Sequence, residues 1–497
     1  MRAAHDLVIR GGLVLDGSGA PGREADVAIR GDRIAAVGKL PPGSGPELDA
    51  RGLAVAPGFI DVHSHDDAAV LLHPQMEFKV RQGVTTEIVG NCGMGPAPGP
   101  QARAFFRAVH PSGELPPFED HAGYLARLEE SPPALNVGVL AGHGTLRSAA
   151  LAEPRGPASA AERSRMRALL AEGLEAGVLG LSTGLIYEPG RHAGAEELTE
   201  LAHDVARAGG IYTTHMRDEG TGLLDSVRET LAVAEATGVR VQISHHKAAG
   251  RPAWGLTAHS LALLEEARGR GLAAAADQYP YTSASTVLAA VLGAVGEGAE
   301  HAGLAGIGGQ DVILAAVPGA RELEGRTLAS VAEDLDLPLH EAAREVLRRA
   351  PATWVILEMM DEEDVRRVLV HETTMIGSDG VPTLEARPHP RLSGTFPRVL
   401  GRYAREAGLL ALEEAVHKMT GLPAATFGLR DRGFVREGAF ADLVLFDPAE
   451  VEDTATVADP FAPPRGIPFV FVNGTAVVRN GEPTAARPGR ALRRAGS

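Results

Sequence analysis

A single cysteine, Cys92, is present in this chain of 497 residues, so an internal disulfide is excluded. The remaining roles for Cys92 are a small buried hydrophobe, a nucleophile or a metal ligand. Lysine is also scarce and occurs only at positions 39, 79, 247 and 418, which leaves arginine to carry most of the positive charge. The few lysines make the position of each one easier to interpret.

The sequence also lacks the features of several protein classes. No apolar run approaches the roughly 18 residues that span a bilayer, and the N-terminal "MRAAHDLVIRGG" has no uninterrupted apolar signal segment. The net charge of −16 and the pI near 5.6 argue against a nucleic-acid partner. With 44% hydrophobic and 23% charged residues, the composition is that of a soluble globular protein. We therefore expect a cytoplasmic protein with a small-molecule partner and no membrane partner. The sequence does not indicate an oligomeric state.

Both ends of the chain have the pattern of short strands joined by tight turns. Near the N-terminus the pattern appears in "DLVIRGGLVLDGSG" and "ADVAIRGDRIAAVG", and near the C-terminus in "GAFADLVLFDP" and "IPFVFVNGTAVVRNGEPT". We expect residues 1–57 and 426–485 to form one small β-sandwich, and two unrelated β-extensions are the alternative. Residues 486–497 are predicted to be a polar tail.

The long middle section, residues 58–425, alternates strand-like apolar runs with amphipathic stretches, which is typical of βα units on a parallel sheet. Eight runs are the number that a closed (β/α)8 TIM-like barrel of the α/β class requires. They are "GFIDVH", "TTEIVGN", "LNVGVLAGH", "GVLGLSTG", "GIYTTHM", "VRVQISH", "LAAAADQY" and "TTMIGSDG". A ninth run, "TWVILEMM" at 353–360, follows a stretch at about 286–350 that we interpret as an insertion late in the barrel. The sequence does not decide whether the ninth run belongs to the barrel or to the insertion.

Metal-binding types of side chain follow five of these eight runs. In a (β/α)8 barrel the carboxyl ends of the strands converge on one face, so residues far apart in sequence meet there. His63 and His65 are two residues apart and lie on the same side of a strand. Imidazole, thiolate and carboxylate together suit Zn²⁺. The residues that follow runs one, two, five, six and eight are His63, His65, Cys92, His215, His245 and Asp379.

These motifs resemble those of the amidohydrolase superfamily and, more narrowly, of the D-aminoacylases, the N-acyl-D-amino-acid deacylases. The resemblance rests on "GFIDVHSHDD", "TTEIVGNCG", "THMRDEG", "SHHK", "IGSDG" and "MTGLPAATFGLRDRGFVREGAFADLVLFD", and it extends over nearly the whole chain. It implies zinc-dependent hydrolysis of N-acyl-D-amino acids to a carboxylate and a free D-amino acid by metal-activated water. The preference for the D form comes from the resemblance alone.

The resemblance also answers the question that Cys92 raises. Many amidohydrolases bridge two metals with a carboxylated lysine at the end of strand four, but "GLSTGLIYEPG" in that place has no lysine nearby. In the deacylases a cysteine thiolate after strand two takes the metal, and Cys92 occupies that position. The family pattern implies that Cys92, His215 and His245 hold one tightly bound zinc ion. His63, His65 and Asp379 then border a second position that is weakly occupied or empty.

The remaining candidate residues concern proton transfer and substrate binding. Asp379 is predicted to act as general base and then general acid, and a structural role in the turn "SDG" is the alternative. Lys247 is the best candidate to bind the substrate carboxylate. Packing or surface roles are the alternative for the further candidates Tyr187, Tyr279, Tyr281, Arg391 and His143. We expect hydrophobic or neutral amino-acid side chains in the substrate, because the pocket motifs show no second obvious arginine.

Two rival functions are compatible with parts of the pattern. A cyclic-amide hydrolase of the hydantoinase or dihydroorotase kind would share the barrel, but such enzymes typically use the strand-four lysine. A non-catalytic binding protein descended from an amidohydrolase would be expected to have lost metal ligands, and all six candidate ligands are present.

Overall fold

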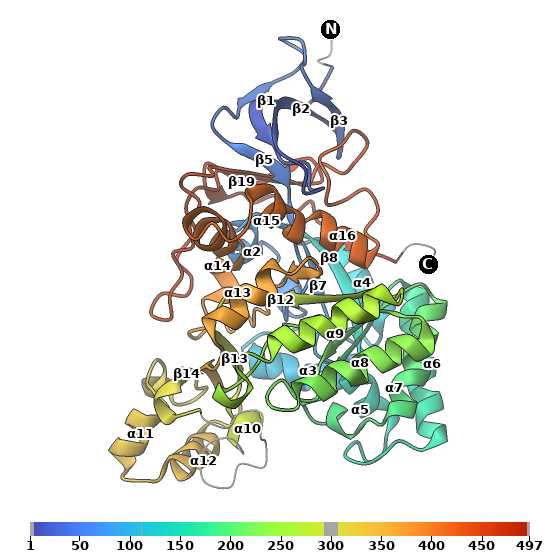
Figure 1. Cartoon of the computed structure of the whole chain (residues 1–497), viewed down its shortest axis with the longest axis vertical. Helices are drawn as coiled ribbons and strands as arrows, with labels where there is room; N and C mark the ends of the chain where they lie inside the picture. The colour runs from blue at the N-terminus through green and yellow to red at the C-terminus, as the bar shows by residue number, and fades with distance from the viewer. Residues whose placement is uncertain (1–3, 111, 293–306, 495–497) are drawn as a thin grey trace.

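The computed structural model describes residues 4–110, 112–292 and 307–494, and it contains three sheets with helices packed around one of them (Figure 1). The first residues of the predicted sandwich, part of the predicted insertion and the last residues of the predicted tail lie outside these ranges. Within them, no helix has the length and apolar character needed to cross a membrane.

Strands from both ends of the chain form one nine-stranded sheet, as expected for a shared β domain. The order is β20–β19–β18–β17–β5–β1–β2–β3, with β4 beside β1. The two ends meet where β17 pairs antiparallel with β5, placing Leu443 opposite Pro57. The turn between β18 and β19 is Asn473–Gly474, with φ of 47° and 78°, as the twist of a tight hairpin requires. The strands are β1 (Leu7–Val14), β2 (Arg23–Arg30), β3 (Arg33–Gly38), β4 (Glu47–Asp49), β5 (Ala54–Pro57), β17 (Leu443–Phe446), β18 (Phe469–Val472), β19 (Thr475–Arg479) and β20 (Glu482–Pro483).

The eight predicted barrel runs each contain a strand, and these strands pair in parallel in chain order. Their order is β6–β7–β8–β9–β10–β11–β12–β16. A parallel bridge between Ser64 and Gly380 joins the segments that follow the first and last strands, so the barrel is nearly closed. The strands are β6 (Phe59–Asp61), β7 (Val84–Val89), β8 (Asn136–Gly142), β9 (Gly180–Gly184), β10 (Ile211–His215), β11 (Arg240–Ile243), β12 (Ala274–Gln278) and β16 (Thr374–Ile376).

Amphipathic helices pack on the outside of the barrel. In α7 the buried residues Leu198, Leu201, Ala202 and Val205 follow the spacing of one helix face, and this face contacts β9 and β10. Neighbouring helices then pack side by side, as α6, α7, α8 and α9 do in Figure 1. The described α-helices outside the insertion are α1 (Ala69–Leu72), α2 (Glu77–Val80), α3 (Gly99–Val109), α4 (His121–Glu130), α5 (His143–Ala150), α6 (Ala160–Ala176), α7 (Ala195–Arg207), α8 (Leu223–Thr237), α9 (Thr257–Gly269), α13 (Glu362–Val370), α14 (Arg391–Arg398), α15 (Leu412–Met419) and α16 (Gly421–Phe427).

The insertion is a small domain at the opposite end of the molecule from the N-terminal strands (Figure 1). Its antiparallel sheet has the order β13–β15–β14. The run at 353–360 contains β15, so it belongs to the insertion and not to the barrel. The elements of the insertion are β13 (Ser283–Val287), α10 (Leu288–Val291), β14 (Val312–Ala316), α11 (Leu328–Leu335), α12 (Leu339–Arg349) and β15 (Trp354–Glu358).

The C-terminal segment differs from the polar tail that its composition suggests. Its strand β21 (Ala491–Leu492) pairs in parallel with β8, with Ala491 opposite Val137. The guanidinium of Arg493 lies 2.6 Å from the Glu129 carboxylate. The two apolar residues Ala491 and Leu492 are enough to hold this arginine-rich segment against the barrel, because the backbone of β21 pairs with β8.

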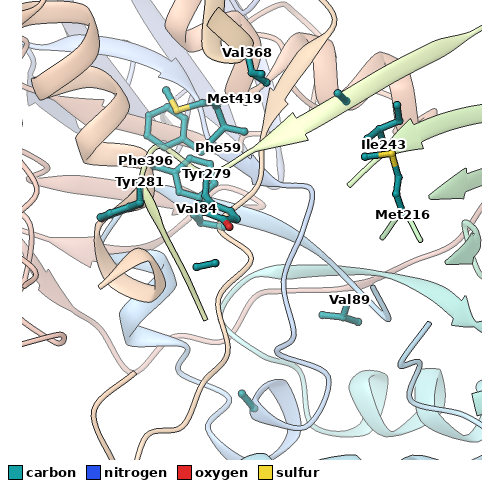
Figure 2. Packing of buried hydrophobic residues seen from close by; sticks show 14 of the residues in the cluster. Phe59, Val84, Val89, Met216, Ile243, Tyr279, Tyr281, Val368, Phe396 and Met419 are labelled. Atoms are coloured by element: carbon teal, nitrogen blue, oxygen red, sulfur yellow. The ribbon is translucent and has the colours of Figure 1, made fainter. Parts of the chain in front are cut away.

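Large apolar side chains fill the core next to the strands that carry the site. The rings of Phe59 and Phe396 stack with centroids 5.7 Å apart, and Figure 2 shows Val84 and Tyr279 in the same region. All four side chains are buried. Burial of a side chain of this size contributes about 1.5–3 kcal/mol to the free energy of folding. This packing therefore stabilises the strands that carry the site.

Candidate metal centre and active site

The six predicted ligand side chains lie together at the carboxyl ends of the barrel strands, and all are buried. Cys92 Sγ lies 3.3 Å from His63 Nε2 and 3.5 Å from His245 Nε2. The His245 Nε2 atom is 2.8 Å from His215 Nδ1. Three overlapping groups have ligand atoms within 4.8 Å of one another: Cys92–His215–His245, His63–His65–Cys92 and His63–His245–Asp379.

This donor set fits a zinc ion. With Zn–N near 2.0 Å and Zn–S near 2.3 Å, donors around a tetrahedral ion lie about 3.4–3.6 Å apart, close to the distances from Cys92 to its two nearest imidazoles. Burial opposes ionisation of the Cys92 thiol, but His63 and His245 lower its pKa well below the usual value. The thiolate, which is the form that binds metal, is therefore available.

Three of these residues have a backbone conformation that L-amino acids rarely adopt. The φ angles of Cys92, His245 and Asp379 are 53°, 36° and 49°. Such residues cost about 1–3 kcal/mol each unless the surroundings hold them, and they gather at functional sites. The backbone N–H of His245 donates to Asp277 Oδ1 at 3.0 Å, and that of Asp379 donates to the His63 carbonyl at 2.7 Å. These bonds hold the turned backbone after the strands.

Glu219 is a buried site residue that we did not predict from the sequence, although it lies in the motif "THMRDEG". Its Oε1 atom lies 2.6 Å from Lys247 Nζ and 2.9 Å from His245 Nδ1. Lys247 Nζ also lies 2.8 Å from His245 Nδ1. Because a carboxylate can only accept a hydrogen bond, the contact with Glu219 places the ring proton of His245 on Nδ1. The Nε2 atom of His245 is then free to bind a metal. Burial opposes ionisation of Glu219, and Lys247 with the nearby imidazoles lowers its pKa far below the usual value.

Asp277 at the end of β12 is a second residue that we missed. It lies 3.4 Å from His63 Nδ1, and it also accepts a hydrogen bond from the Gln242 side chain. Glu219 and Asp277 each contact the Nδ1 atom of a histidine, His245 and His63 respectively, which is the ring nitrogen that faces away from the metal position. A carboxylate behind a metal-binding histidine fixes the orientation and tautomer of the ring.

Asp379 lies between the predicted metal positions and a buried arginine. Its Oδ1 is 3.2 Å from His65 Nε2 and 3.5 Å from His63 Nε2, while its Oδ2 is 2.9 Å from Arg391 Nη1. Burial alone would raise the pKa of Asp379, but Arg391, His245 and His63 hold it well below the usual value. Asp379 is therefore ionised at neutral pH and can accept a proton from water.

A cavity of about 430 Å³ opens over these residues. Of the predicted substrate contacts, Lys247, Tyr187 and Tyr279 line it. The Arg391 guanidinium lies 4.4 Å from the centre of the Tyr279 ring and reaches the site through Asp379. Arg191, which we did not predict, lines the cavity as an exposed residue near Glu188.

Two predicted substrate contacts, His143 and Tyr281, are not among the residues that line this cavity. His143 begins α5 and is buried away from the cavity, where its Nε2 lies 2.7 Å from Glu197 Oε1. Arg147, one turn further along α5, pairs with the same carboxylate. Tyr281 packs against His389 with ring centroids 5.2 Å apart and is not part of the cavity lining. A position at a strand end does not determine the direction of the side chain.

Residues 47–484 match the sequence model of the amidohydrolase family. The chain belongs to the amidohydrolase family. This amidohydrolase is 45% identical over 495 residues to an N-acyl-D-glutamate deacylase of Alcaligenes xylosoxydans xylosoxydans, a match that covers 99% of this chain and 98% of that one. Full-length identity at this level places it in the D-aminoacylase branch of the family.

Two solved structures are similar to this amidohydrolase over nearly the whole chain. An N-acyl-D-glutamate deacylase from Bordetella bronchiseptica, complexed with zinc and a phosphonate mimic of the tetrahedral intermediate, has a TM-score of 0.90 and 41% identity over 98% of this chain and 99% of that one. A D-aminoacylase has a TM-score of 0.88 and 41% identity over 99% of this chain and 100% of that one. The work on that D-aminoacylase assigns its binuclear metal centre one-metal activation and second-metal attenuation.

Proposed function

We propose that this amidohydrolase is an N-acyl-D-amino-acid deacylase that hydrolyses the linear amide bond to release a carboxylate and a free D-amino acid. The observation that carries the proposal is the buried cluster in which the Cys92 thiolate, several imidazoles and the ionised Asp379 meet below a cavity. The deacylase relatives support the same substrate class, whereas a cyclic-amide hydrolase or a non-catalytic protein has no comparable support.

In this proposal, Cys92, His215 and His245 hold one tightly bound zinc ion. His63, His65 and Asp379 border a second position that is weakly occupied or empty. When bound, zinc polarises a carbonyl and lowers the pKa of its water to about 7. Glu219 and Asp277 orient His245 and His63 from behind, so the donor atoms are already aligned.

Asp379 moves the proton. Its carboxylate accepts a proton from the attacking water while the water oxygen bonds to the scissile carbonyl carbon. The same proton then passes to the substrate nitrogen as the C–N bond breaks, because an amine is a poor leaving group until it is protonated. Arg391, 2.9 Å from Asp379, keeps the carboxylate ionised before each turnover.

Lys247 binds the free carboxylate of the substrate, and the rings of Tyr187 and Tyr279 flank it along the cavity. We propose hydrophobic or neutral amino-acid side chains, because Arg191 lies at the exposed edge of the cavity beside Glu188 and not in its buried part. The cytoplasm is the proposed location.

The test is amine release from N-acetyl-D- and N-acetyl-L-amino acids by zinc-reconstituted wild type and Cys92→Ala. We expect cleavage of the D series alone by wild type, loss of activity with a chelator and recovery with zinc. Cys92→Ala is expected to lose activity by at least 10³-fold and to bind less than one zinc per chain. Its circular dichroism checks folding. Hydrolysis of neither series by a zinc-loaded wild type would contradict the proposal, and cyclic amides would be the next substrates to assay.

A further inference from the structure

The β13–β15 pair of the insertion forms one wall of the cavity and extends from its polar side to an apolar side. The register runs from Ser283 opposite Glu358 to Val287 opposite Trp354. Beside the first end, the Met359 carbonyl accepts a hydrogen bond from Gly250 N–H at 2.8 Å, in the loop that carries Lys247. The other end carries Trp354 and is separated from the Lys247 loop by the length of the strand.

The half of the cavity near Lys247 carries charged and hydroxyl-bearing side chains beside Met359. Lys247, Glu219 and Tyr279 line it, and the Lys247 ammonium lies 5.9 Å from the centre of the Tyr279 ring. This half suits the substrate carboxylate in the proposed function. The bond to be cleaved then lies over the metal ligands, so the acyl group must extend toward the opposite side of the barrel mouth.

The opposite half is apolar and aromatic. The Phe105 ring lies 6.2 Å from the ring of His65, which follows the first barrel strand, and 6.5 Å from the ring of Trp354. Val381 and Val287 belong to the same apolar cluster as Trp354, and all four apolar residues line the cavity. His65 follows β6 and His215 ends β10, which face each other across a barrel of eight strands. Lys247 follows β11, the neighbour of β10, so the aromatic side lies across the metal ligands from Lys247.

The dimensions exceed what an acetyl group needs. From Trp354 to Met359 the chain advances five residues, about 16 Å at roughly 3.3 Å per residue. An N-acetylamino acid spans roughly two residues, about 7 Å. The cavity volume of about 430 Å³ lies within the range of about 300–1,000 Å³ that holds drug-sized ligands. Much of the apolar half stays unfilled by an acetyl substrate whose carboxylate contacts Lys247.

We propose that Phe105, Trp354, Val287 and Val381 form a binding subsite for a large apolar acyl group, such as a medium-length alkanoyl or an arylacetyl group. The inference rests on the proposed deacylase function and names the class of acyl group that it acts on. Each additional methylene that the subsite buries favours binding by about fourfold. Phenylacetyl and hexanoyl substrates therefore have a kcat/KM at least tenfold above that of the acetyl substrate with the same D-amino acid.

The experiment measures kcat/KM for N-acetyl-, N-hexanoyl- and N-phenylacetyl derivatives of one D-amino acid with zinc-loaded enzyme. It is repeated with Trp354→Ala, Phe105→Leu and a control, Phe461→Ala, at an exposed position outside the cavity lining. We expect the phenylacetyl-to-acetyl ratio to fall at least tenfold in Trp354→Ala, and severalfold in Phe105→Leu, which keeps an apolar side chain in case the first variant does not fold. The ratio is expected not to change in Phe461→Ala.

The outcomes separate this inference from the proposed function. Equal kcat/KM values for the three acyl groups would refute the subsite while leaving the deacylase function intact. A change in the ranking of D-amino-acid side chains, with no change in the acyl ratio, would show that the aromatic wall holds the side chain and would also refute the inference. Failure of wild type to cleave any of these amides would overturn the proposed function itself.

Discussion

Replacement of Glu219 by glutamine tests how strongly a residue behind the ligands controls the metal centre. Glu219 Oε1 contacts Lys247 Nζ at 2.6 Å and His245 Nδ1 at 2.9 Å. A hydrogen bond to a charged group contributes about 1.5–3 kcal/mol and a neutral one about 0.5–1.5 kcal/mol. Glutamine preserves the shape and one acceptor, so the change removes about 1–2 kcal/mol from each contact while the ring of His245 stays in place.

We expect the zinc affinity of Glu219→Gln to fall about 10- to 100-fold, which is the usual cost of losing such a partner and corresponds to about 1.4–2.8 kcal/mol. The assay is competition for zinc with a chromophoric chelator, followed by amine release at saturating zinc. Because Glu219 acts through His245, saturating zinc should restore much of the lost activity. Glu188→Gln is the matched control, since Glu188 lines the same cavity and contacts His192 at 2.8 Å. A dissociation constant within twofold of wild type, or an equal loss in the control, would refute the argument.

Two further predictions concern stability. Burial lowers the pKa of His121 to about 4, whereas in the unfolded chain the same imidazole is protonated below about pH 6.5. The contribution of neutral His121 to the unfolding free energy is therefore fully present above pH 6.5 and falls by about 2 kcal/mol at pH 5. Urea unfolding at pH 7 and pH 5 measures how much unfolding free energy each protein loses on acidification. His121→Leu should lose less than wild type by that amount, and an equal loss in both proteins would contradict the prediction. Lys79 is buried 2.6 Å from Asp61 and 3.1 Å from Asp66. Lys79→Met should lose about 3–5 kcal/mol of unfolding free energy because it leaves buried carboxylates without a cation. Lys39→Met, at an exposed position, is the control, and equal unfolding midpoints would count against this reasoning.

The barrel and the gathering of its metal-type residues were predictable for one physical reason. Parallel barrel strands appear in the sequence as short apolar runs. Closure of the barrel brings their carboxyl ends together on one face, independently of the conformation of the loops. The polar residue that follows each run therefore reaches the same face, as Cys92 and His215 do. The insertion was also recognisable, but the sequence did not assign the run at 353–360 to the barrel or to the insertion, because a buried antiparallel strand has the same apolar composition as a barrel strand.

Other parts of the site depend on loop paths and side-chain directions that no local pattern encodes. Glu219 reaches His245 because the loop after β10 folds back over the barrel. His143 follows a barrel strand just as His215 does, yet it begins α5, which packs against α6 and β9, and its side chain turns toward Glu197. The pairing of Ala491 with β8 was hidden for a related reason, since two apolar residues among arginines carry almost no strand signal.

By itself, the sequence determined the βα alternation, the β-rich character of both ends, and the presence of one thiol, several imidazoles and a carboxylate after five of the eight runs. These features are local, because they depend on periodicity and on the residue type at a given position. Only the tertiary structure decided which carboxylates stand behind His63 and His245, that Arg391 pairs with Asp379, and how far the cavity extends beyond the metal ligands. Each of these is a distance between segments far apart in the chain, and it is set by the packing of loops and the insertion on the barrel.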